Sequence, residues 1–382
     1  MKEINRAQLA ELIKKNDEIA YVATAITPWH AIGVIASILS LKLERKKGIV
    51  LVNSHTGRIL INEPNFSLIS ENIEVYTIVK GKSSRKKIGG CGFVIPNILL
   101  YSLLGKLRKS SKKLHLITPM DVELVAASSL HYALKDRVIC NNVYDEGLAT
   151  YFPVSHTKRV TKDQGLKIRM KSTFLVWYFD KLCRSLYNAT QSFENNCLFV
   201  KRTEQLDVNN RIVPFYKTAI EEGADNGTFN KSIFENAVVI TPNAWMRKEV
   251  TDNADTEALK RLMDSLIDEK IKFVVKLHPR DTWTNELCSE YREHIHTNNS
   301  ISTENLFASL EVKPKCVIGF SSTTLVTAKL FWNIPAFNMA DIVDNANLSK
   351  LYIAEKRYFN EIFGFYIDSP KSMDSLIESI NG

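Results

Sequence analysis

The sequence lacks the short motifs that mark several large classes of enzyme. Its 382 residues contain no Asp-x-Asp pair of the kind that presents a divalent cation to a diphosphate, no Walker loop and no G-x-G-x-x-G. These absences argue against a metal-assisted diphosphate site, a P-loop enzyme and a dinucleotide-dependent enzyme. We therefore expect no metal ion and no cofactor.

Paired cysteines and long apolar runs are also missing. The six cysteines lie far apart and form no C-x-x-C pair, which argues against a zinc site and a disulfide framework and predicts free thiols in a reducing compartment. The longest uncharged stretches, residues 21–41 apart from His30 and residues 89–105, are both interrupted by proline, so neither predicts a membrane span. Residues 1–5 are polar and helix-like rather than signal-like. We expect a cytoplasmic protein.

Positive charge is concentrated in the N-terminal half. Residues 1–172 hold 27 Lys and Arg against 14 Asp and Glu, whereas the rest of the chain holds 23 against 28. Such basic stretches are ordinary solvated faces, a track for a polyanion or a contact with anionic lipid. Nucleic acid is not expected, because no recognisable nucleic-acid fold and no interleaving of aromatic and basic residues occurs.

Strand-like and helix-like segments alternate along the chain, which predicts parallel sheets covered on both faces. The apolar patterns predict strands at residues 18–25, 48–53, 74–79, 114–118, 138–143, 237–241, 273–277, 316–320 and 335–339. They predict helices at residues 31–43, 174–193, 255–269 and 322–332.

The length of the chain predicts two α/β domains. The segment at residues 221–231 contains Asn and Gly and is the best candidate for their connection. It divides the chain into domains at residues 1–225 and 226–382, with packing of the last helix back on the N-terminal domain as one option. Two Rossmann-like domains facing a central cleft, the GT-B architecture, are the expected fold.

Two helices are predicted from particular side chains. The helix at 255–269 carries a stripe with the spacing of a sheet-packed face, formed by Leu259, Leu262, Met263, Leu266 and Ile267. A second, short helix is expected to begin at Glu304 with Thr303 as its N-cap.

Polar clusters follow four of the predicted strands, at the strand ends where open α/β sheets bind ligands. The first is the YDEG stretch at residues 144–147. One of its two acids can be fixed by local hydrogen bonds while the other serves as a general base, and Gly147 permits close approach of the backbone. The alternative is a solvated turn.

The second cluster is the KLHPR stretch at residues 276–280. Cationic and hydrogen-bonding groups at this strand end suit a phosphate, and His278 suits a group that neutralises phosphate charge or protonates a leaving oxygen. The alternative is a structural histidine that packs on Pro279.

The third cluster, at residues 319–324, has the sequence GFSSTT and lies where a strand turns into a helix. Hydroxyl groups and free backbone N–H groups at a helix N-terminus form an anion site without a metal or a lysine. A serine N-cap explains one of these hydroxyl groups and leaves the others unexplained.

The fourth cluster is the ITPWH stretch at residues 26–30. Thr27 as N-cap and Pro28 as the first helical residue predict a helix start whose positive end would face the cleft. His30 is either a substrate contact or a half-buried structural histidine.

Three of these clusters, Asp145-Glu146-Gly147, His278-Pro279 and Ser321-Ser322-Thr323, occur in the order found in bacterial sialyltransferases. The sequence resembles the capsular polysialyltransferases, which share the D/E-D/E-G and H-P motifs with the lipooligosaccharide sialyltransferases. The resemblance spans most of the chain. It implies an inverting, metal-independent transfer of sialic acid from CMP-sialic acid to a sialylated acceptor in capsular polysaccharide synthesis.

Carried over to this sequence, the resemblance implies that Glu146 deprotonates the acceptor hydroxyl and that His278 helps CMP depart. Ser321 and Ser322 would hold phosphate oxygens, and Glu304 would bind the ribose hydroxyls. The remaining residues assigned to the donor site are Lys276, Pro279, Thr323 and Gly147.

The basic N-terminal half suits an acceptor with one carboxylate per sugar. The residues assigned to the acceptor are Thr27, Pro28, His30, Arg85, Lys86, Lys87, Lys109 and Arg169. The same charge suits a peripheral contact with the anionic inner membrane, where capsule-assembly proteins would be partners.

Other functions also fit these motifs. One is a teichoic-acid-type polymerase that uses CDP-glycerol or a similar donor, and another is a lipooligosaccharide sialyltransferase. A catalytically inactive module that binds polyanions is the alternative from a different class.

Overall fold

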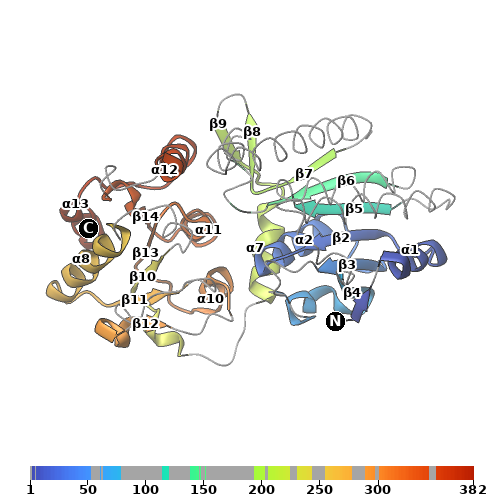
Figure 1. The fold of residues 1–382 in the computed structure, drawn as a ribbon, viewed down its shortest axis with the longest axis horizontal. Coiled ribbons are helices and arrows are strands. Elements are labelled where there is room, and N and C mark those ends of the chain that lie inside the picture. Colours follow the sequence, from blue (N-terminus) through green and yellow to red (C-terminus); the bar gives the residue numbers. More distant parts are fainter. Residues whose placement is uncertain are drawn as a thin grey trace, which may run out of the picture. The chain divides into compact units, whose positions relative to one another are not determined.

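The structure is a computed structural model that describes residues 2–4, 6–52, 61, 63–78, 114–119, 138–145, 147, 151, 193–202, 205–223, 230–242, 254–277, 289–296, 301–343 and 350–382. The chain divides into two compact units, unit 1 at Met1–Gly223 and unit 2 at Ala224–Gly382. Each unit is built on its own parallel sheet (Figure 1).

The sheet of unit 1 has seven strands in the order β1-β4-β3-β2-β5-β6-β7, and all its pairings are parallel. Beyond the edge strand β1, this order is that of a doubly wound Rossmann sheet. The strands are β1 (Lys2–Ile4), β2 (Tyr21–Ala25), β3 (Gly48–Val52), β4 (Ile73–Ile78), β5 (Leu114–Pro119), β6 (Val138–Tyr144) and β7 (Phe193–Asn196).

The helices of unit 1 pack on this sheet. α1 (Arg6–Lys15) buries Leu9 and Ile13 against strand residues, and α2 (Pro28–Ser40) packs on β2, β5 and β6. α2 is apolar nearly all round, as a helix buried between a sheet and other helices must be. It also contacts the 3-10 helix η1 (Glu63–Asn72) and α7 (Val213–Glu222).

A glycine allows α2 to approach the sheet closely. A Cβ atom at Gly33 would lie 2.4 Å from the Tyr144 ring, closer than any side chain tolerates. An antiparallel hairpin, β8 (Phe199–Arg202) and β9 (Gln205–Val208), follows β7 and leads into α7. The close contact between α2 and Tyr144 brings the first turn of α2 beside the end of β6.

Unit 2 has a five-stranded parallel sheet in the order β12-β11-β10-β13-β14. The strands are β10 (Val238–Thr241), β11 (Phe273–Lys276), β12 (Ile295–His296), β13 (Cys316–Gly319) and β14 (Ala336–Asn338). The helices are α8 (Ala254–Asp268), α10 (Thr303–Ser309), α11 (Thr323–Trp332), α12 (Lys350–Phe363) and α13 (Met373–Asn381), with 3-10 turns η5 (Lys231–Ile233), η7 (Arg292–His294) and η8 (Met339–Asp341). α8 and α13 cover one face of the sheet, and α10 and α11 cover the other (Figure 1).

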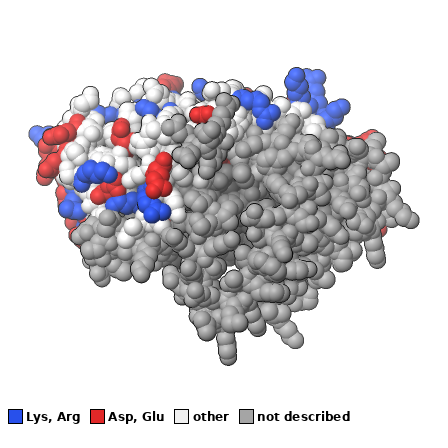
Figure 2. Space-filling model, turned by 90° about the horizontal axis from the view of Figure 1, so that it is seen from above, with Lys and Arg blue, Asp and Glu red and all other residues white. Residues whose placement is uncertain are grey.

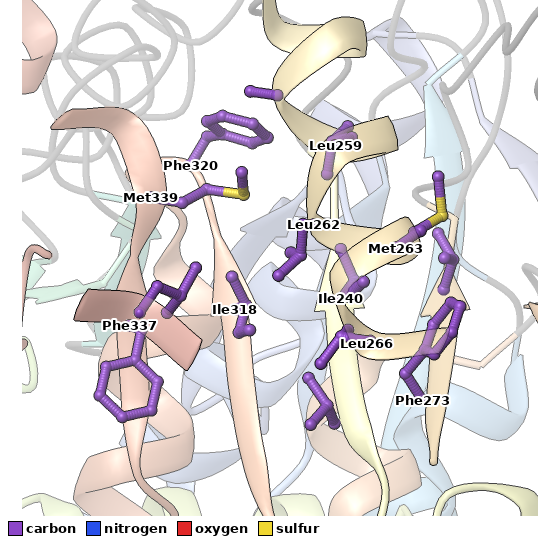
Figure 3. Packing of buried hydrophobic residues seen from close by; sticks show 14 of the residues in the cluster. Ile240, Leu259, Leu262, Met263, Leu266, Phe273, Ile318, Phe320, Phe337 and Met339 are labelled. Carbon is purple, nitrogen blue, oxygen red and sulfur yellow. The ribbon is translucent and has the colours of Figure 1, made fainter. Parts of the chain in front are cut away.

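The core of unit 2 lies between α8 and the sheet. Leu259, Leu262, Met263 and Leu266 are fully buried among strand residues (Figure 3). Truncation of one of these side chains to alanine would cost about 2–5 kcal/mol of the free energy of unfolding. The fifth residue of the predicted stripe is different: Ile267 is 47% exposed, because the helical repeat places it at the margin of the face that Leu259, Leu262 and Leu266 bury.

The predicted α/β class with parallel sheets is confirmed, and two local expectations are wrong. Residues 2–4 form a short strand rather than a helix, because they pair with β4 at the sheet edge. Ser302, not Thr303, caps α10, since its side chain accepts a hydrogen bond from the Asn305 backbone N–H at 3.1 Å. The last helix buries Leu376 and Ile380 in the core of unit 2, beside α8, and its predicted packing on the N-terminal domain stays a prediction.

Other expectations remain untested. The long helix predicted at residues 174–193 lies outside the described residues except at Phe193, which begins strand β7. The predicted cleft between two domains stays a prediction. Among the helices that the structure describes, none is long and apolar enough to cross a membrane.

Candidate active site

The turn that follows β6 in unit 1 is organised by the buried carboxylate of Asp145. Its Oδ1 accepts a hydrogen bond from the Gly147 backbone N–H at 2.6 Å, and its Oδ2 accepts from the Leu198 N–H at 3.3 Å and from the Tyr151 hydroxyl. Gly147 has φ 113°, a conformation that favours glycine. The hydrogen bonds therefore fix the backbone on both sides of residue 146.

Asp145 is suited to an anchoring role rather than to proton transfer with a substrate. Burial raises the pKa of its carboxyl to about 6, although the hydrogen bonds from Tyr151, Gly147 and Leu198 offset part of that rise. Its backbone N–H also donates to the Tyr216 hydroxyl at 3.0 Å. The predicted base, Glu146, lies outside the described residues, so its role stays a prediction.

The N-terminus of α2 is built as predicted. The Thr27 hydroxyl accepts a hydrogen bond from the His30 backbone N–H at 3.3 Å, and Pro28 is the first helical residue. His30 is only 4% exposed, and its Nδ1 accepts from the Ile26 backbone N–H at 3.2 Å. The ring of His30 thus has a structural partner, and an acceptor-binding role for these three residues stays a prediction.

Two of the predicted clusters lie side by side in unit 1. The His30 ring meets the Tyr144 ring edge-on at 5.7 Å between centroids, and the Tyr144 hydroxyl donates to the Thr24 carbonyl at 2.6 Å. The Tyr216 side chain of α7 contacts both clusters, because its ring lies 5.7 Å from the Trp29 ring and its hydroxyl binds the Asp145 N–H. The helix N-terminus and the Asp145 turn therefore form one polar region at the carboxyl ends of β2 and β6.

The corresponding region of unit 2 lies at the junction of β13 and α11. Ser322 caps α11, and its hydroxyl accepts a hydrogen bond from the Thr324 backbone N–H at 3.3 Å, while Thr323 is the first helical residue. Ser321 is 8% exposed, and its buried hydroxyl makes no hydrogen bond to any described residue. An orphaned buried hydroxyl is costly.

This junction lies at the topological switch point of the second sheet. β13 and β11 flank β10 on opposite sides, and ligands of open α/β sheets bind where the strand order reverses. A Cβ atom at Gly319 would lie 2.8 Å from Thr241 Oγ1 and 2.9 Å from the Thr241 carbonyl oxygen. A side chain at position 319 would therefore clash with Thr241 of β10.

Two further residues assigned to the donor site are buried together in unit 2. The Glu304 carboxylate accepts a hydrogen bond from the Thr327 hydroxyl of α11 at 3.1 Å. Burial raises the pKa of Glu304, and the Thr327 hydroxyl and the positive charge of Lys276 offset part of the rise. Lys276 is 3% exposed at the end of β11. The Glu304 side chain is thus held against α11, whereas His278 and Pro279 lie outside the described residues.

Several residues of these regions escaped the sequence-based prediction. Asn338 is the clearest, because its amide oxygen accepts the Ser321 N–H at 2.9 Å. It is a polar residue at the end of an apolar strand, the same signal that identified the other clusters. Tyr151 and Tyr216 carry no such signal, since their contacts with Asp145 depend on the folded chain.

The basic residues assigned to the acceptor cannot be placed. Arg85, Lys86, Lys87, Lys109 and Arg169 lie outside the described residues. On the face that Figure 2 shows, Lys and Arg side chains of the described residues are interspersed with Asp and Glu. Within the described part of the chain, no group of three His, Cys, Asp or Glu side chains could hold a metal ion.

Two parallel sheets of Rossmann order, with polar groups at the carboxyl ends of their strands, define the class of doubly wound α/β proteins. Sequence comparison identifies the family within this class: residues 24–341 match the alpha-2,8-polysialyltransferases, and the chain belongs to that family. The predicted resemblance is confirmed. The protein is therefore a glycosyltransferase of the sialyltransferase type, and the family implies a nucleotide-sugar donor and an acceptor glycan.

Solved structures give weaker likenesses. An alpha/beta-galactoside alpha-2,3-sialyltransferase from Photobacterium phosphoreum is 15% identical with a TM-score of 0.48, over 94% of this chain and 100% of that one. A sialyltransferase GT-B domain from Photobacterium damselae is 12% identical with a TM-score of 0.46, over 92% and 98% of the two chains. A putative UDP-N-acetylglucosamine 2-epimerase from Listeria monocytogenes is 10% identical with a TM-score of 0.48, over 95% and 96%. The family assignment rests on the sequence match alone. A search of curated proteins finds no match.

Proposed function

We propose that the protein is an inverting, metal-independent sialyltransferase that transfers sialic acid from CMP-sialic acid to an oligosialic or polysialic acceptor. One observation of the structure carries the donor assignment: the buried Ser321 hydroxyl lacks a described partner and precedes the N-terminus of α11 at the switch point. A CMP donor has a single phosphate, which suits a compact cradle of this kind.

The cradle would act on the leaving group. Negative charge develops on the CMP phosphate as the bond to the sugar breaks, and a hydroxyl together with backbone N–H groups at a helix N-terminus stabilises such charge without a metal. Ser321 supplies the hydroxyl, because the Ser322 hydroxyl already caps α11. His278 would neutralise or protonate the departing phosphate.

The base would come from unit 1. In a single displacement, Glu146 takes the proton of the acceptor hydroxyl while the acceptor oxygen forms its bond to the sugar and the phosphate oxygen leaves, which inverts the anomeric centre. Support for this role comes from the Asp145 and Gly147 contacts, which fix the backbone on both sides of Glu146. A positioned base of this kind contributes about 10²–10⁴-fold to the rate.

The acceptor would be held by the basic N-terminal half. Residues 1–172 carry nearly twice as many basic as acidic side chains, and Arg85, Lys86 and Lys87 lie in that half. A polymer with one carboxylate per sugar suits such a surface. The same charge would keep the protein at the cytoplasmic face of an anionic membrane, beside the proteins that assemble the capsule.

A coupled assay of nucleotide release tests this function. We expect CMP release from CMP-sialic acid when an oligosialic acceptor is present, with an unchanged rate after addition of a chelator. Release from CDP-glycerol instead would establish the teichoic-acid alternative. Transfer to a neutral galactoside but not to the oligosialic acceptor would favour a lipooligosaccharide sialyltransferase, and glycan binding without turnover would indicate an inactive module.

A further inference from the structure

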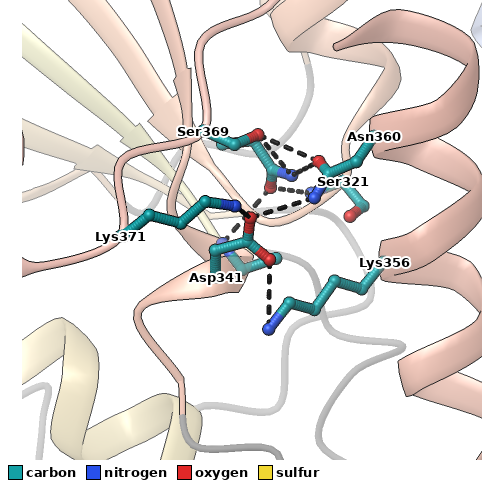
Figure 4. A network of polar contacts seen from close by, with 8 residues as sticks. Ser321, Asp341, Lys356, Asn360, Ser369 and Lys371 are labelled. Carbon is teal, nitrogen blue, oxygen red and sulfur yellow. Dashed lines mark hydrogen bonds and ion pairs between the residues drawn. The ribbon is translucent and has the colours of Figure 1, made fainter.

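A hydrogen-bond network lies behind Ser321 and connects it to β14, α12 and the chain before α13 (Figure 4). We propose that Asn338, at the end of β14, is a positioning residue of the donor site, which holds Ser321 in the conformation that binds the donor phosphate. This inference rests on the proposed function.

The backbone of Ser321 needs such support. It has φ 42°, in the left-handed region that a non-glycine residue adopts only at a cost. Four other described residues that are not glycine have a left-handed backbone conformation. Three of them, Lys42, Lys270 and Asn333, lie at the C-terminal ends of helices, where this conformation is common, and Asn236 lies in a turn. Ser321 differs from all four because it precedes a helix. The surrounding contacts must therefore impose its conformation.

Asn338 supplies the main contact. Its amide oxygen accepts hydrogen bonds from the backbone N–H groups of Ser321 at 2.9 Å and of Ala340 at 3.3 Å. Asn338 is fully buried, and its own backbone N–H donates to the Asp368 carbonyl at 2.8 Å. Asn338 is thus held through both its side chain and its backbone, and the Ser321 N–H points toward β14. The Ser321 hydroxyl itself has no described partner.

The other end of the amide fixes its orientation. The Asn338 Nδ2 group donates to Asn360 Oδ1 at 3.3 Å and to Ser369 Oγ at 3.4 Å. Ser369 in turn donates to Asn360 Oδ1 at 2.9 Å. Because acceptors surround the nitrogen and donors surround the oxygen, the amide cannot be reversed without loss of four hydrogen bonds.

The ion-paired carboxylate of Asp341 holds the Asn360 side chain that contacts the Asn338 amide. Asp341 accepts a hydrogen bond from Asn360 Nδ2 at 3.0 Å, and it pairs with Lys356 at 3.1 Å and with Lys371. Burial raises the pKa of Asp341, but the hydrogen bonds and charges of the two lysines outweigh burial and leave it below its usual value. The carboxylate therefore stays charged and holds Asn360, and α12 with it, in place.

Two substitutions at one position separate positioning from charge. Asn338→Asp keeps an acceptor for the Ser321 N–H but adds a buried negative charge and removes both Nδ2 donors. Asn338→Leu has a similar volume, is neutral and removes the acceptor as well. If Asn338 positions Ser321, both variants bind the donor less tightly than the wild-type protein does. If the only requirement at position 338 is a neutral side chain, Asn338→Leu behaves like the wild-type protein.

The measurements are the Kd of CMP by calorimetry and the separate KM values for CMP-sialic acid and for the oligosialic acceptor. Loss of an oriented hydrogen bond predicts a rise of about tenfold in the CMP Kd and the donor KM. The acceptor KM should not change. Asn360→Ala, which removes only the support of the amide, predicts a smaller rise of about twofold to fivefold. Ile380→Val serves as the stability control, since this side chain belongs to the core beside α8 and to no bond of the network.

Three outcomes decide the inference. If Asn338→Leu and Asn360→Ala keep the wild-type CMP Kd while Ser321→Ala weakens it, Asn338 does not position Ser321 and the inference is wrong. If Ser321→Ala also binds CMP like the wild-type protein, the phosphate cradle itself is wrong and the proposed donor site fails first. If the Asn338 variants do not fold, Asn360→Ala and Ser369→Ala test the same network, and an unchanged donor KM in both would overturn it.

Discussion

The turns after β6 and after β13 are both held by hydrogen bonds to a buried side chain, but the kind of side chain differs. Each follows a parallel strand and presents a polar residue at the edge of its sheet. In unit 1 the support is a charged side chain next in sequence, since Asp145 binds the N–H groups of Gly147 and Leu198. In unit 2 the support is a neutral amide from the neighbouring strand, since Asn338 binds Ser321.

The difference matches the charge that each turn would meet. The turn in unit 1 would place a base beside an acceptor hydroxyl, where a buried carboxylate is tolerable. The turn in unit 2 would receive a phosphate, and a fixed carboxylate in direct contact with Ser321 would repel it. There the buried carboxylate, Asp341, lies behind the amides and is paired with two lysines.

The largest expected effect comes from the turn in unit 1. Glu146→Ala should lower kcat by about 10²–10⁴-fold, because it removes the proposed base, and should leave the CMP Kd unchanged. Turnover under saturating donor and calorimetry with CMP measure the two quantities. Glu18→Ala, at an exposed ion pair with Lys47, is the control. Near-normal turnover of Glu146→Ala would mean that the turn has no catalytic role.

The next effect separates the two serines in unit 2. Ser321→Ala should weaken CMP binding by roughly tenfold to a hundredfold, the range for a lost hydrogen bond to a charged group. Ser322→Ala removes the cap of α11 and should instead cost about 1 kcal/mol of the free energy of unfolding. CMP titration and denaturant unfolding of both variants measure the contrast. Equal loss of CMP affinity in both would show that the hydroxyl groups have the same role.

A smaller effect is expected in the pH dependence of stability. Burial raises the pKa of Asp145 to about 6, above its unfolded value, so the folded protein binds this proton more tightly than the unfolded chain does. The contribution of Asp145 to stability is therefore greatest at low pH and declines as pH rises through about 6. Asp145→Asn lacks this titration.

Denaturant unfolding of both proteins between roughly pH 4 and 7 measures that difference. The stability deficit of Asp145→Asn relative to wild type should shrink as pH rises. A deficit that grows with pH would mean that the carboxylate is stabilised by its hydrogen bonds more than it is disfavoured by burial.

Much of the fold follows from the sequence because it depends on local signals. The strands predicted from apolar runs lie within about three residues of their observed bounds, and the Thr27-Pro28 helix start is as predicted. The edge strand at residues 2–4 depends on pairing with β4, which no local pattern announces. The error at α10 is of one residue, because Ser302 and Thr303 are both good caps.

The site was less predictable than the fold, because several of its contacts join residues that are distant in the sequence. Gly147 and Ser322 act within their own turns, so their sequence context is informative. Asn338 acts on a residue 17 positions away, and its role depends on β13 and β14 being neighbours. Likewise, the burial of Glu304 follows from its contact with Thr327 of the next helix. Contacts of this kind depend on strand and helix order rather than on local pattern.

A crystal structure of the protein with CMP tests the central claim most directly. The proposed donor site predicts a phosphate oxygen within hydrogen-bond distance of the Ser321 hydroxyl, at the N-terminus of α11. A phosphate bound elsewhere in the protein, with the Ser321 hydroxyl unchanged, would contradict it.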